Sequence, residues 1–238
     1  MAEPLLMIEG LSAGYGDVRV LWDISLSVDA GEITCIVGSN GAGKTTLLRT
    51  VSGLVRATSG RIRFAGEDVT ELGPDQILGR GIAHVPEGRR LFRGLNVRDN
   101  LMLGAYLRRD DAEVRKDLDY VFSLFPILRE RHKQDAITLS GGEQQMCAIA
   151  RGIMSRPKLL MIDELSLGLA PRLVERLGEA LLEINRTGIT ILLVEQDVLT
   201  AFEIARHGLI IETGRVSMSG TTQALSDNPA IRQAYLGI

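Results

Sequence analysis

The sequence predicts an α/β fold with a mostly parallel sheet, antiparallel strands near the N-terminus and an inserted helical subdomain. Two dense aliphatic runs, residues 158–163 and 190–195, flank a segment with apolar residues at helical spacing, residues 171–186. Two buried parallel strands joined by a crossover helix explain this order. Residues 97–135 change to helix-favouring sequence of mixed charge, which indicates a helical insertion.

Length and composition favour a single domain. The chain has 238 residues, 45% hydrophobic and 24% charged, which is sufficient for one globular domain with a full core. We expect one domain over residues 1–238. Its nucleotide-binding core comprises about 1–90 and 136–238, and its helical subdomain about 91–135.

Charge and hydropathy exclude several classes of function. With 27 basic and 30 acidic residues the formal net charge is −3, so nucleic acid is not an expected partner. The apolar runs are far shorter than the roughly 20 residues that cross a bilayer. The first ten residues carry Glu3 and Glu9 and lack a basic region and a long apolar stretch, so we expect no secretion signal.

The N-terminal part of the chain alternates short β-like runs with turns. Residues 5–9, 21–28 and 32–37 predict three early strands, the last ending at a glycine. Residues 45–51 contain no helix breaker and predict a short helix that Gly53 ends. The order strand, glycine-rich loop, helix follows from these assignments.

Further strands are predicted before and after the helical insertion. Residues 61–64 read as one strand, and residues 82–85 as another that Pro86 stops. Near the C-terminus, Gly214 and Gly220 predict the turns of a short hairpin, followed by a small helix.

The glycine-rich loop matches the pattern GxxxxGK[ST] in full, at the strand-to-helix junction that this motif requires. Glycines let backbone N–H groups turn inward on phosphate groups, and the helix N-terminus adds partial positive charge. We predict that Lys44 reaches the β and γ phosphates and that Thr45 binds Mg²⁺. The nucleotide-binding residues predicted here are Gly38, Ser39, Asn40, Gly41, Ala42, Gly43, Lys44, Thr45 and Thr46.

The aliphatic strand 158–163 ends in two adjacent carboxylates, Asp163 and Glu164. Carboxylates at strand ends cluster where ligands bind in α/β sheets. We predict that Asp163 holds Mg²⁺ through its water shell and that Glu164 accepts a proton from the attacking water as general base. The alternative is a solvated acidic loop, which the nearby phosphate loop disfavours.

The string Leu139-Ser140-Gly141-Gly142-Glu143-Gln144-Gln145 is an LSGGQ-type signature. A serine and glycines at a helix start form a second anion-binding nest. The string follows the phosphate loop and precedes the strand ending in Asp163 and Glu164. In this order it resembles the ATP-binding cassette (ABC) ATPases along essentially the whole chain. The resemblance implies a P-loop NTPase core, ATP and Mg²⁺ as cofactors, and a role for Ser140, Gly141 and Gly142 toward the ATP of an opposing subunit.

Several departures from the family's general pattern narrow the resemblance. Glu87 stands where a glutamine is usual after strand 82–85, and we assign it to the metal site with Thr45 and Asp163. Gln196 stands in place of the switch histidine, and we assign it a catalytic role. Ala170 lies in the D-loop, residues 166–171, between the strand-end carboxylates and the following helix. With Glu87, Gln196 and Ala170 at these positions, the sequence resembles the ATPase subunits of branched-chain amino acid importers. Such an importer has two ATPases, and the sequence resembles the shorter one.

Two further positions follow from the family comparison. Tyr15 falls where the family places an aromatic residue that stacks on adenine, although a surface tyrosine in a turn is the alternative. Leu165 stands where ABC proteins generally carry proline after the catalytic glutamate, which affects the entry to the D-loop rather than the nucleotide site.

The resemblance implies an ATPase coupled to membrane transport that powers uptake of branched-chain amino acids. It implies a peripheral location on the cytoplasmic face of the inner membrane. Implied partners are a second ABC ATPase subunit in a homodimer or heterodimer, two membrane permease subunits, and a periplasmic or extracellular substrate-binding protein that acts through the permease.

Three alternatives stay open at this point. Importers of urea or short amides carry similar Glu-Gln motifs. A non-transport ABC ATPase would usually show paired cassettes or long coiled coils, which the sequence lacks. A subunit that binds ATP without hydrolysing it is favoured by Leu165, Ala170 and Gln196, whereas the intact phosphate loop and strand-end carboxylates argue against it.

Overall fold

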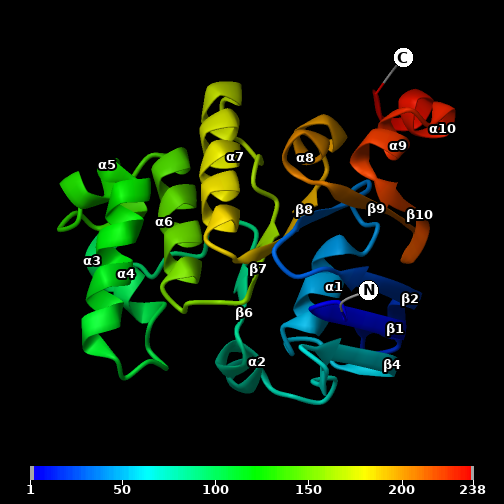
Figure 1. Ribbon diagram of the computed structural model, residues 1–238, viewed down its shortest axis with the longest axis horizontal. Helices are drawn as coiled ribbons and strands as arrows, with labels where there is room; N and C mark the ends of the chain where they lie inside the picture. Colours follow the sequence, from blue (N-terminus) through cyan, green and yellow to red (C-terminus); the bar gives the residue numbers. More distant parts are fainter. Residues whose placement is uncertain (1–2, 237–238) are drawn as a thin grey trace.

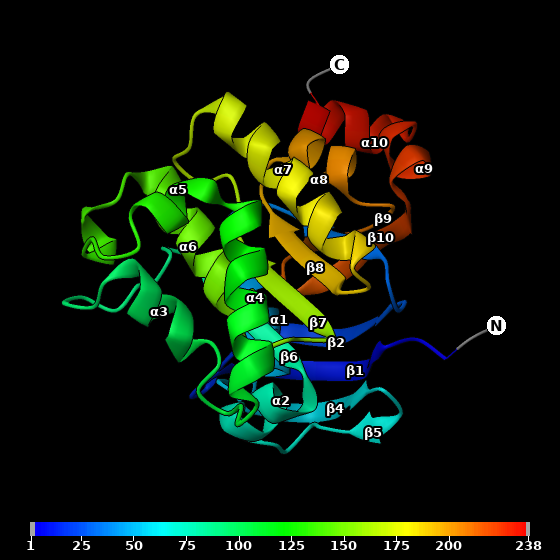
Figure 2. The same cartoon turned by 60° about the vertical axis from the view of Figure 1, so that its left-hand side comes forward.

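The computed structural model describes residues 3–236, which form two sheets with helices packed around them (Figures 1 and 2). The larger sheet has the strand order β10-β9-β3-β8-β7-β6. Its strands from β9 to β6 are parallel, and β10 pairs antiparallel with β9 at one edge. The strand bounds are β3 Ile33–Val37, β6 Ile82–Val85, β7 Leu159–Asp163, β8 Thr190–Glu195, β9 His207–Glu212 and β10 Arg215–Thr221.

The smaller sheet is antiparallel and has the order β2-β1-β4-β5. Its bounds are β1 Leu6–Tyr15, β2 Val18–Val28, β4 Ala57–Phe64 and β5 Glu67–Asp68. These observations confirm the predicted combination of a mostly parallel sheet with antiparallel strands near the N-terminus.

The helices divide between the two faces of the parallel sheet. Helix α1 lies beside the antiparallel strands, whereas α6, α7 and α8 lie on the other side (Figure 1). The bounds are α1 Lys44–Val51, α2 Pro74–Arg80, α3 Val97–Leu103, α4 Asp111–Leu124, α5 Pro126–Glu130, a 3₁₀ turn Ala136–Thr138, α6 Gly141–Ile153, α7 Pro171–Arg186, α8 Val198–Ile204, α9 Thr222–Ser226, α10 Pro229–Ile231 and a π-helical turn Arg232–Leu236.

The central strand β3 is buried on both faces, as a parallel sheet covered by helices requires. Because successive side chains point to opposite faces, Cys35 and Val37 join the cluster under the helices, whereas Ile36 joins the cluster between the two sheets. The burial on both sides explains why apolar residues predominate in this strand, where Thr34 is the one polar residue, and why β7 is apolar up to Asp163.

The predicted helical insertion is occupied by α3, α4 and α5, which Figures 1 and 2 show together on one side of the molecule. Their apolar residues, including Leu101, Leu118 and Phe122, share one cluster with Ile149 of α6. Helix α6 also approaches the parallel sheet, where Gly152 lies against Leu160. The division into a core and a subdomain at about 91–135 stays a prediction, since α6 is continuous with both parts.

Three local differences from the sequence prediction have identifiable causes. Strand β1 runs beyond residue 9 because Gly10 has a φ of +60° at a register shift, so a bulge continues the strand instead of ending it. The turn predicted at Gly220 is wrong, since this residue lies inside β10 opposite Gly208. Helix α8 was not predicted, although the Asp197 side chain accepts hydrogen bonds from the N–H groups of Leu199 and Thr200 at its start.

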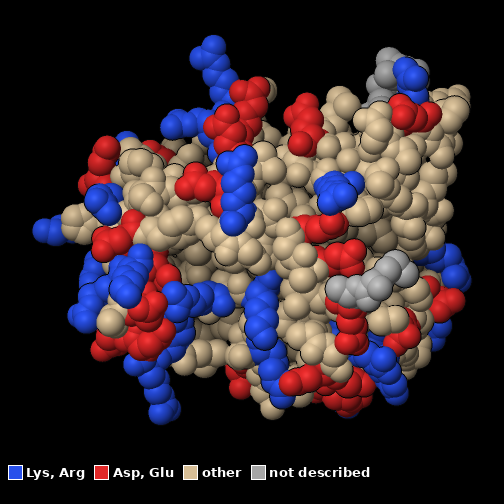
Figure 3. Space-filling view, viewed as in Figure 1, with Lys and Arg blue, Asp and Glu red and all other residues tan. Residues whose placement is uncertain are grey.

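The exposed face shown in Figure 3 carries basic and acidic side chains interspersed among uncharged ones. Among residues 3–236 no helix combines the length and the hydropathy needed to cross a bilayer.

Gly214, in the turn between β9 and β10, joins the two sheets to the glycine-rich loop. Its carbonyl accepts a hydrogen bond from the Trp22 N–H at 2.8 Å, and its own N–H donates to the Ala42 carbonyl at 2.9 Å. Its φ is +77°, and a Cβ there would overlap the Val20 carbonyl oxygen. Only glycine fits this turn without displacement of β2.

We predict that Gly214→Ala lowers the free energy of unfolding by about 2 to 4 kcal/mol, because it adds backbone strain and overlap at once. Urea denaturation measures the change. Gly220→Ala is the matched control, because a Cβ there meets no atom within 4 Å among the described residues, and its effect should stay within about 0.5 kcal/mol. Equal stability of Gly214→Ala and wild type would contradict the assigned role of this turn.

Candidate functional site

The hydrogen-bond register of the parallel sheet brings three chain segments to one edge. Val37 pairs with Glu195, and Asp163 pairs with Val194, so β3, β7 and β8 end side by side. Gly38, Glu164 and Gln196 are the residues that follow these three ends. The predicted phosphate loop, the predicted general base and the predicted switch residue therefore leave the sheet at the same edge, where ligands bind in open parallel sheets.

The segment from Gly38 to Lys44 forms a loop that ends directly in helix α1. Gly41 and Gly43 have φ values of +81° and +106°, which L side chains rarely adopt. A Cβ on Gly43 would also lie 2.9 Å from the Leu21 side chain. The conformation of the loop therefore depends on its glycines, as the motif predicts.

Lys44 is the first residue of α1, and its side chain is only 4% exposed. Its ammonium donates hydrogen bonds to the carbonyl oxygens of Gly38 at 2.8 Å and Ser39 at 3.2 Å. These contacts fix the cation inside the curve of the loop. A buried ammonium at a helix N-terminus makes the loop strongly attractive to phosphate oxygens.

A cavity of about 480 Å³ opens at this loop. The residues that line it are Val20, Asn40, Gly41, Gly43, Lys44, Thr45, Thr46, Glu87, Glu164 and Leu167. The structure thus brings the loop residues together with Glu87 and Glu164, which lie far away in the sequence. Ser140, Gly141 and Gly142 are not among the described residues that line this cavity.

Asp163 lies beneath the cavity and is 1% exposed. Its Oδ1 accepts a hydrogen bond from the Thr45 hydroxyl at 3.2 Å, whereas its buried Oδ2 has no partner among residues 3–236. Burial raises the pKa of this carboxyl to about 6, against the hydrogen bond from Thr45, and the carboxylates of Glu164 and Glu87 raise it further.

These residues fit a magnesium ion. Carboxylate and hydroxyl oxygens are the ligands that Mg²⁺ prefers. A buried carboxylate oxygen that accepts no hydrogen bond, such as Oδ2 of Asp163, costs free energy, and a bound cation would offset this cost. Mg²⁺ bound here would neutralise charge on phosphate oxygens. Thr45 would hold it through its hydroxyl oxygen and Asp163 through its carboxylate and the water shell of the ion, and Glu87 lines the same cavity.

Glu164 adopts a left-handed backbone conformation with a φ of +56°. A non-glycine residue in this region carries strain of about 1 to 3 kcal/mol, which the surrounding structure must offset. The Glu164 N–H donates to the Val194 carbonyl at 2.9 Å, which extends the pairing of β7 and β8 by one residue. The resulting turn directs this residue to the cavity wall instead of along the sheet.

The loop after β6 carries Glu87 and is held by helix α6. Arg151 of α6 donates hydrogen bonds to the carbonyl oxygens of Arg90 at 2.9 Å and Arg89 at 3.4 Å. Arg89 and Arg90 both have positive φ values. The Arg89 guanidinium in turn lies about 3.1 Å from the position of a Cβ on Gly141, so this loop also contacts the signature segment.

The signature segment forms the N-terminus of α6. Ser140 is its N-cap, and its hydroxyl accepts a hydrogen bond from the Glu143 N–H at 3.4 Å while the Glu143 carboxylate accepts from the Ser140 N–H at 2.8 Å. Gly142 is buried, and a Cβ there would overlap the side chain of Leu173 in α7. Packing against α7 therefore requires glycine at this position, independently of the predicted anion binding.

Tyr15 and Gln196 lie at the margin of the site. Tyr15 ends β1 and is 45% exposed, and its hydroxyl accepts a hydrogen bond from Arg49 of α1 at 3.3 Å. Gln196 follows β8 and is exposed. Neither residue is among the described residues that line the cavity.

Sequence reasoning missed the contacts of Glu195, the residue before Gln196. Glu195 is 1% exposed, and its carboxylate accepts hydrogen bonds from the N–H and the hydroxyl of Ser166, both at 2.9 Å. Leu165, noted in the sequence for replacing proline, is 1% exposed and packs in the same cluster as Leu177. The only sign of these contacts in the sequence was the position of Glu195, which directly follows an aliphatic run that predicts a buried strand.

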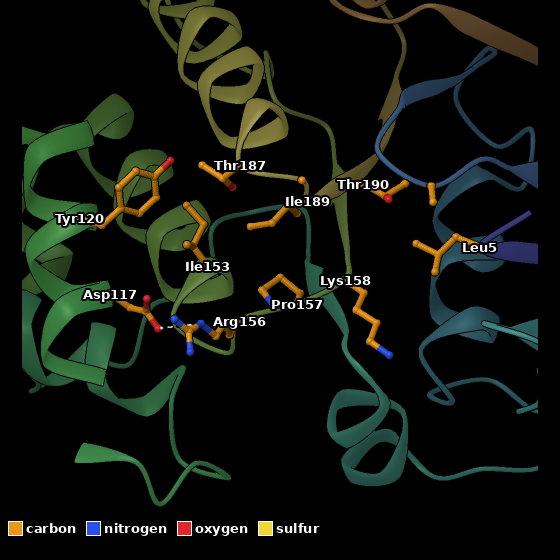
Figure 4. A pocket seen from close by; sticks show the side chains of 12 residues that line it. Leu5, Asp117, Tyr120, Ile153, Arg156, Pro157, Lys158, Thr187, Ile189 and Thr190 are labelled. Carbon is orange, nitrogen blue, oxygen red and sulfur yellow. Dashed lines mark ion pairs between the residues drawn. The ribbon is translucent and has the colours of Figure 1, made fainter. Parts of the chain in front are cut away.

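A second cleft, of about 560 Å³, lies near the amino ends of β7 and β8, away from the phosphate loop (Figure 4). Asp117 and Tyr120 of α4 lie on one side of it, with Ile189 and Lys158 toward the sheet. The ion pair between Asp117 and Arg156 crosses its lower part in Figure 4. None of the predicted nucleotide-site residues is among its described lining residues.

Comparisons with known proteins agree with this geometry. A family model described as "ABC transporter" matches residues 21–166. The chain is 46% identical to the high-affinity branched-chain amino acid transport ATP-binding protein BraG of Pseudomonas aeruginosa, over 98% of this chain and 100% of that protein. It is 36% identical to the probable branched-chain amino acid transport ATP-binding protein LivF of Archaeoglobus fulgidus, over 96% and 97% of the two chains.

A solved structure of an ATP binding subunit of an ABC transporter has a TM-score of 0.84 and 31% identity with this chain, and the match covers 98% of this chain and 96% of that one. The predicted P-loop NTPase fold of ABC type is therefore confirmed. With its phosphate loop, strand-end carboxylates and signature segment in the arrangement described above, this chain belongs to the ABC transporter family as an ATP-binding subunit.

Proposed function

We propose that this chain is the ATP-hydrolysing subunit of an importer for branched-chain amino acids. The observation that carries the hydrolytic part is the single cavity that gathers Lys44, Thr45, Glu87 and Glu164 beside Asp163. The substrate class rests on the two relatives named for branched-chain amino acid transport. The alternative of an importer for urea or short amides finds no support in these names.

In the proposed reaction Lys44 binds the β and γ phosphates, and the loop N–H groups orient them. Glu164 accepts the proton of the attacking water at a carboxylate oxygen. Positioning and electrostatics supply most of the catalysis in phosphoryl transfer, which agrees with a site built from a rigid loop and buried charges. Tyr15 stacks on the adenine, at the end of β1 beside α1.

The proposed assembly is a dimer of ATPase subunits arranged head to tail. Ser140, Gly141 and Gly142 start α6 on a segment separate from the chain's own cavity, so they are available to a nucleotide held by another subunit. We propose that this second subunit is a related ATPase, and that Gln196 makes the two sites of the dimer unequal.

The proposed permease contact is a groove of about 390 Å³ between the loop after β6, α3 and α6. Phe92 and Tyr106 line it and are 52% and 59% exposed. Arg151 connects the groove to the site, because its guanidinium lies 5.2 Å from the Phe92 ring and bonds to the loop that carries Glu87. The chain would then sit on the cytoplasmic face of the inner membrane, against two permease subunits served by a substrate-binding protein.

Reconstitution tests the proposed substrate class. Proteoliposomes would contain this chain, its partner ATPase and the permease subunits, with the binding protein added outside and ATP inside. We expect ATP-dependent uptake of radiolabelled leucine, isoleucine or valine that unlabelled urea does not compete. Uptake of urea or a short amide without uptake of these amino acids would contradict the assignment.

We predict that Lys44→Ala weakens binding of ATP by about 2 to 5 kcal/mol, because the phosphates lose a buried cation. Titration with fluorescent ATP measures the affinity. Lys158→Ala is the control, since Lys158 is an exposed lysine in the cleft of Figure 4, and its affinity should match wild type. Unchanged binding and turnover in Lys44→Ala would remove Lys44 from the site.

We predict that Glu164→Gln keeps ATP affinity but lowers hydrolysis at least a hundredfold, because an amide fills the same space and does not accept the proton from water. Size-exclusion chromatography with ATP and Mg²⁺, with the partner ATPase present, should show a trapped dimer. Glu175→Gln, at an exposed position of α7, is the control for removal of one acidic charge. Turnover at the wild-type rate in Glu164→Gln would reject the general-base role.

We predict that an isolated homodimer of this chain hydrolyses ATP at least tenfold more slowly per site than the complex with its partner ATPase and permease. A glutamine amide donates a hydrogen bond to the γ-phosphate but carries no positive charge, unlike a protonated imidazole. Phosphate release by the two assemblies measures the difference, and Gln196→His should raise the homodimer rate. Equal rates per site, with no effect of Gln196→His, would contradict the prediction.

A further inference from the structure

Glu195 is a charged side chain without a basic partner in the interior of the molecule. It is 1% exposed, and it forms no ion pair with any residue between 3 and 236. A buried carboxylate costs several kcal/mol unless hydrogen bonds satisfy it. Burial accordingly raises the pKa of Glu195, while hydrogen bonds from Ser166, Leu165 and Gln196 lower it again.

The groups that donate hydrogen bonds to Glu195 belong to two separate segments, one that follows β7 and one that follows β8. Oε1 accepts from the Ser166 N–H at 2.9 Å, and Oε2 accepts from the Ser166 hydroxyl at 2.9 Å and from the Gln196 N–H at 3.3 Å. The Leu165 N–H also interacts with this carboxylate and lowers its pKa. One side chain therefore connects the two residues after Glu164 with the residue at the switch position.

These contacts surround the strained turn at Glu164. On its amino side, the Glu164 N–H is bonded to the Val194 carbonyl. On its carboxyl side, Leu165 and Ser166 are bonded to Glu195. Both partners belong to the last two residues of β8, so a rigid strand end holds the left-handed conformation of Glu164 from both sides.

We propose that Glu195 is a positioning residue that holds Glu164 in its catalytic conformation and couples it to Gln196 through Leu165 and Ser166. The inference rests on the proposed role of Glu164 as general base. Glu195 does not line the phosphate cavity within the described part of the chain, so it acts through the backbone and not on the nucleotide.

Leu165 has a defined part in this arrangement. A proline at this position would have no N–H and would remove one donor from the buried carboxylate. Leucine supplies the donor, and its side chain is 1% exposed in the apolar cluster of α7 and β7. This chain therefore has leucine in place of the usual proline at position 165, and Glu195 interacts with the N–H that proline would lack.

Glutamine is not an adequate substitute for Glu195. The carboxylate accepts from several N–H groups with both oxygens, whereas an amide has one accepting oxygen and an NH₂ group that donates. Glu195→Gln would place this NH₂ against backbone donors and leave at least one of them unsatisfied. The segment after Glu164 should then lose its fixed position while the phosphate loop stays intact.

Steady-state ATPase measurements on the complex with the partner ATPase and permease test the proposal. We expect Glu195→Gln to lower kcat at least tenfold while KM and the affinity for fluorescent ATP stay within twofold of wild type. Glu203→Gln, an exposed glutamate on α8, is the matched control and should keep wild-type kcat. A kcat of Glu195→Gln within twofold of wild type would overturn the proposal.

Ser166→Ala and Leu165→Pro decide the matter if Glu195→Gln does not fold. Each removes one donor, and each should lower kcat about three- to tenfold per folded protein, with folding checked by thermal melting. Where Glu195→Gln does fold, the double variant Ser166→Ala/Glu195→Gln should be no slower than Glu195→Gln alone, because both changes act through one carboxylate. Multiplied effects in the double variant, or wild-type kcat in both single-donor variants, would overturn the proposal.

Glu164→Gln separates this proposal from the proposed function. If Glu164→Gln hydrolyses ATP at the wild-type rate, the general-base assignment fails and the positioning role fails with it. If Glu164→Gln is inactive while Glu195→Gln has wild-type kcat, the function stands and the positioning role alone is overturned.

Discussion

The pairing of β8 with β3 on one side and β7 on the other determines how the nucleotide site is assembled. Asp163 pairs with Val194, and Val37 pairs with Glu195, so a shift of one residue in either register would turn the side chains of the shifted strand to the opposite face. Because both faces of this sheet are buried and fully packed, such a shift is strongly disfavoured. The packing of buried aliphatic side chains, which do not line the nucleotide cavity, therefore determines which residues stand at the edge of the sheet where the site forms.

The second constraint on the site is its balance of charge. Burial raises the pKa of the Asp163 carboxyl, the carboxylates of Glu164 and Glu87 raise it further, and the Lys44 ammonium acts in the opposite direction. Glu195 adds a fourth carboxylate at the same edge of the sheet but is satisfied by N–H donors instead of a cation. Asp163 ends β7 and Glu195 ends β8, and their surroundings differ. The surroundings of Asp163 fit a metal ion, whereas Glu195 accepts hydrogen bonds that hold the backbone of the neighbouring segment in place.

The sequence predicted those parts of the site that depend on local chain geometry. The phosphate loop could be located because strand, glycines and helix are contiguous, and Asp163 because it ends an aliphatic run. The contact of Leu173 with Gly142 and the hydrogen bonds of Glu195 could not be derived, since both join segments that are distant in the sequence. The extension of β1 past Gly10 was hidden by a glycine that permits a bulge as readily as a turn.

The contacts of Gly214 also have a consequence for the order in which the chain acquires structure. The loop that holds Lys44 is bonded through Ala42 to Gly214, far along the chain, and β3 pairs with β8 and β9, both from the last quarter of the chain. Contacts of such long separation form late and slowly. During synthesis, a nascent chain that already contains the whole glycine-rich motif still lacks the strands that shape it. Nucleotide binding is therefore a property that this protein gains only near the end of translation, when its C-terminal hairpin has emerged.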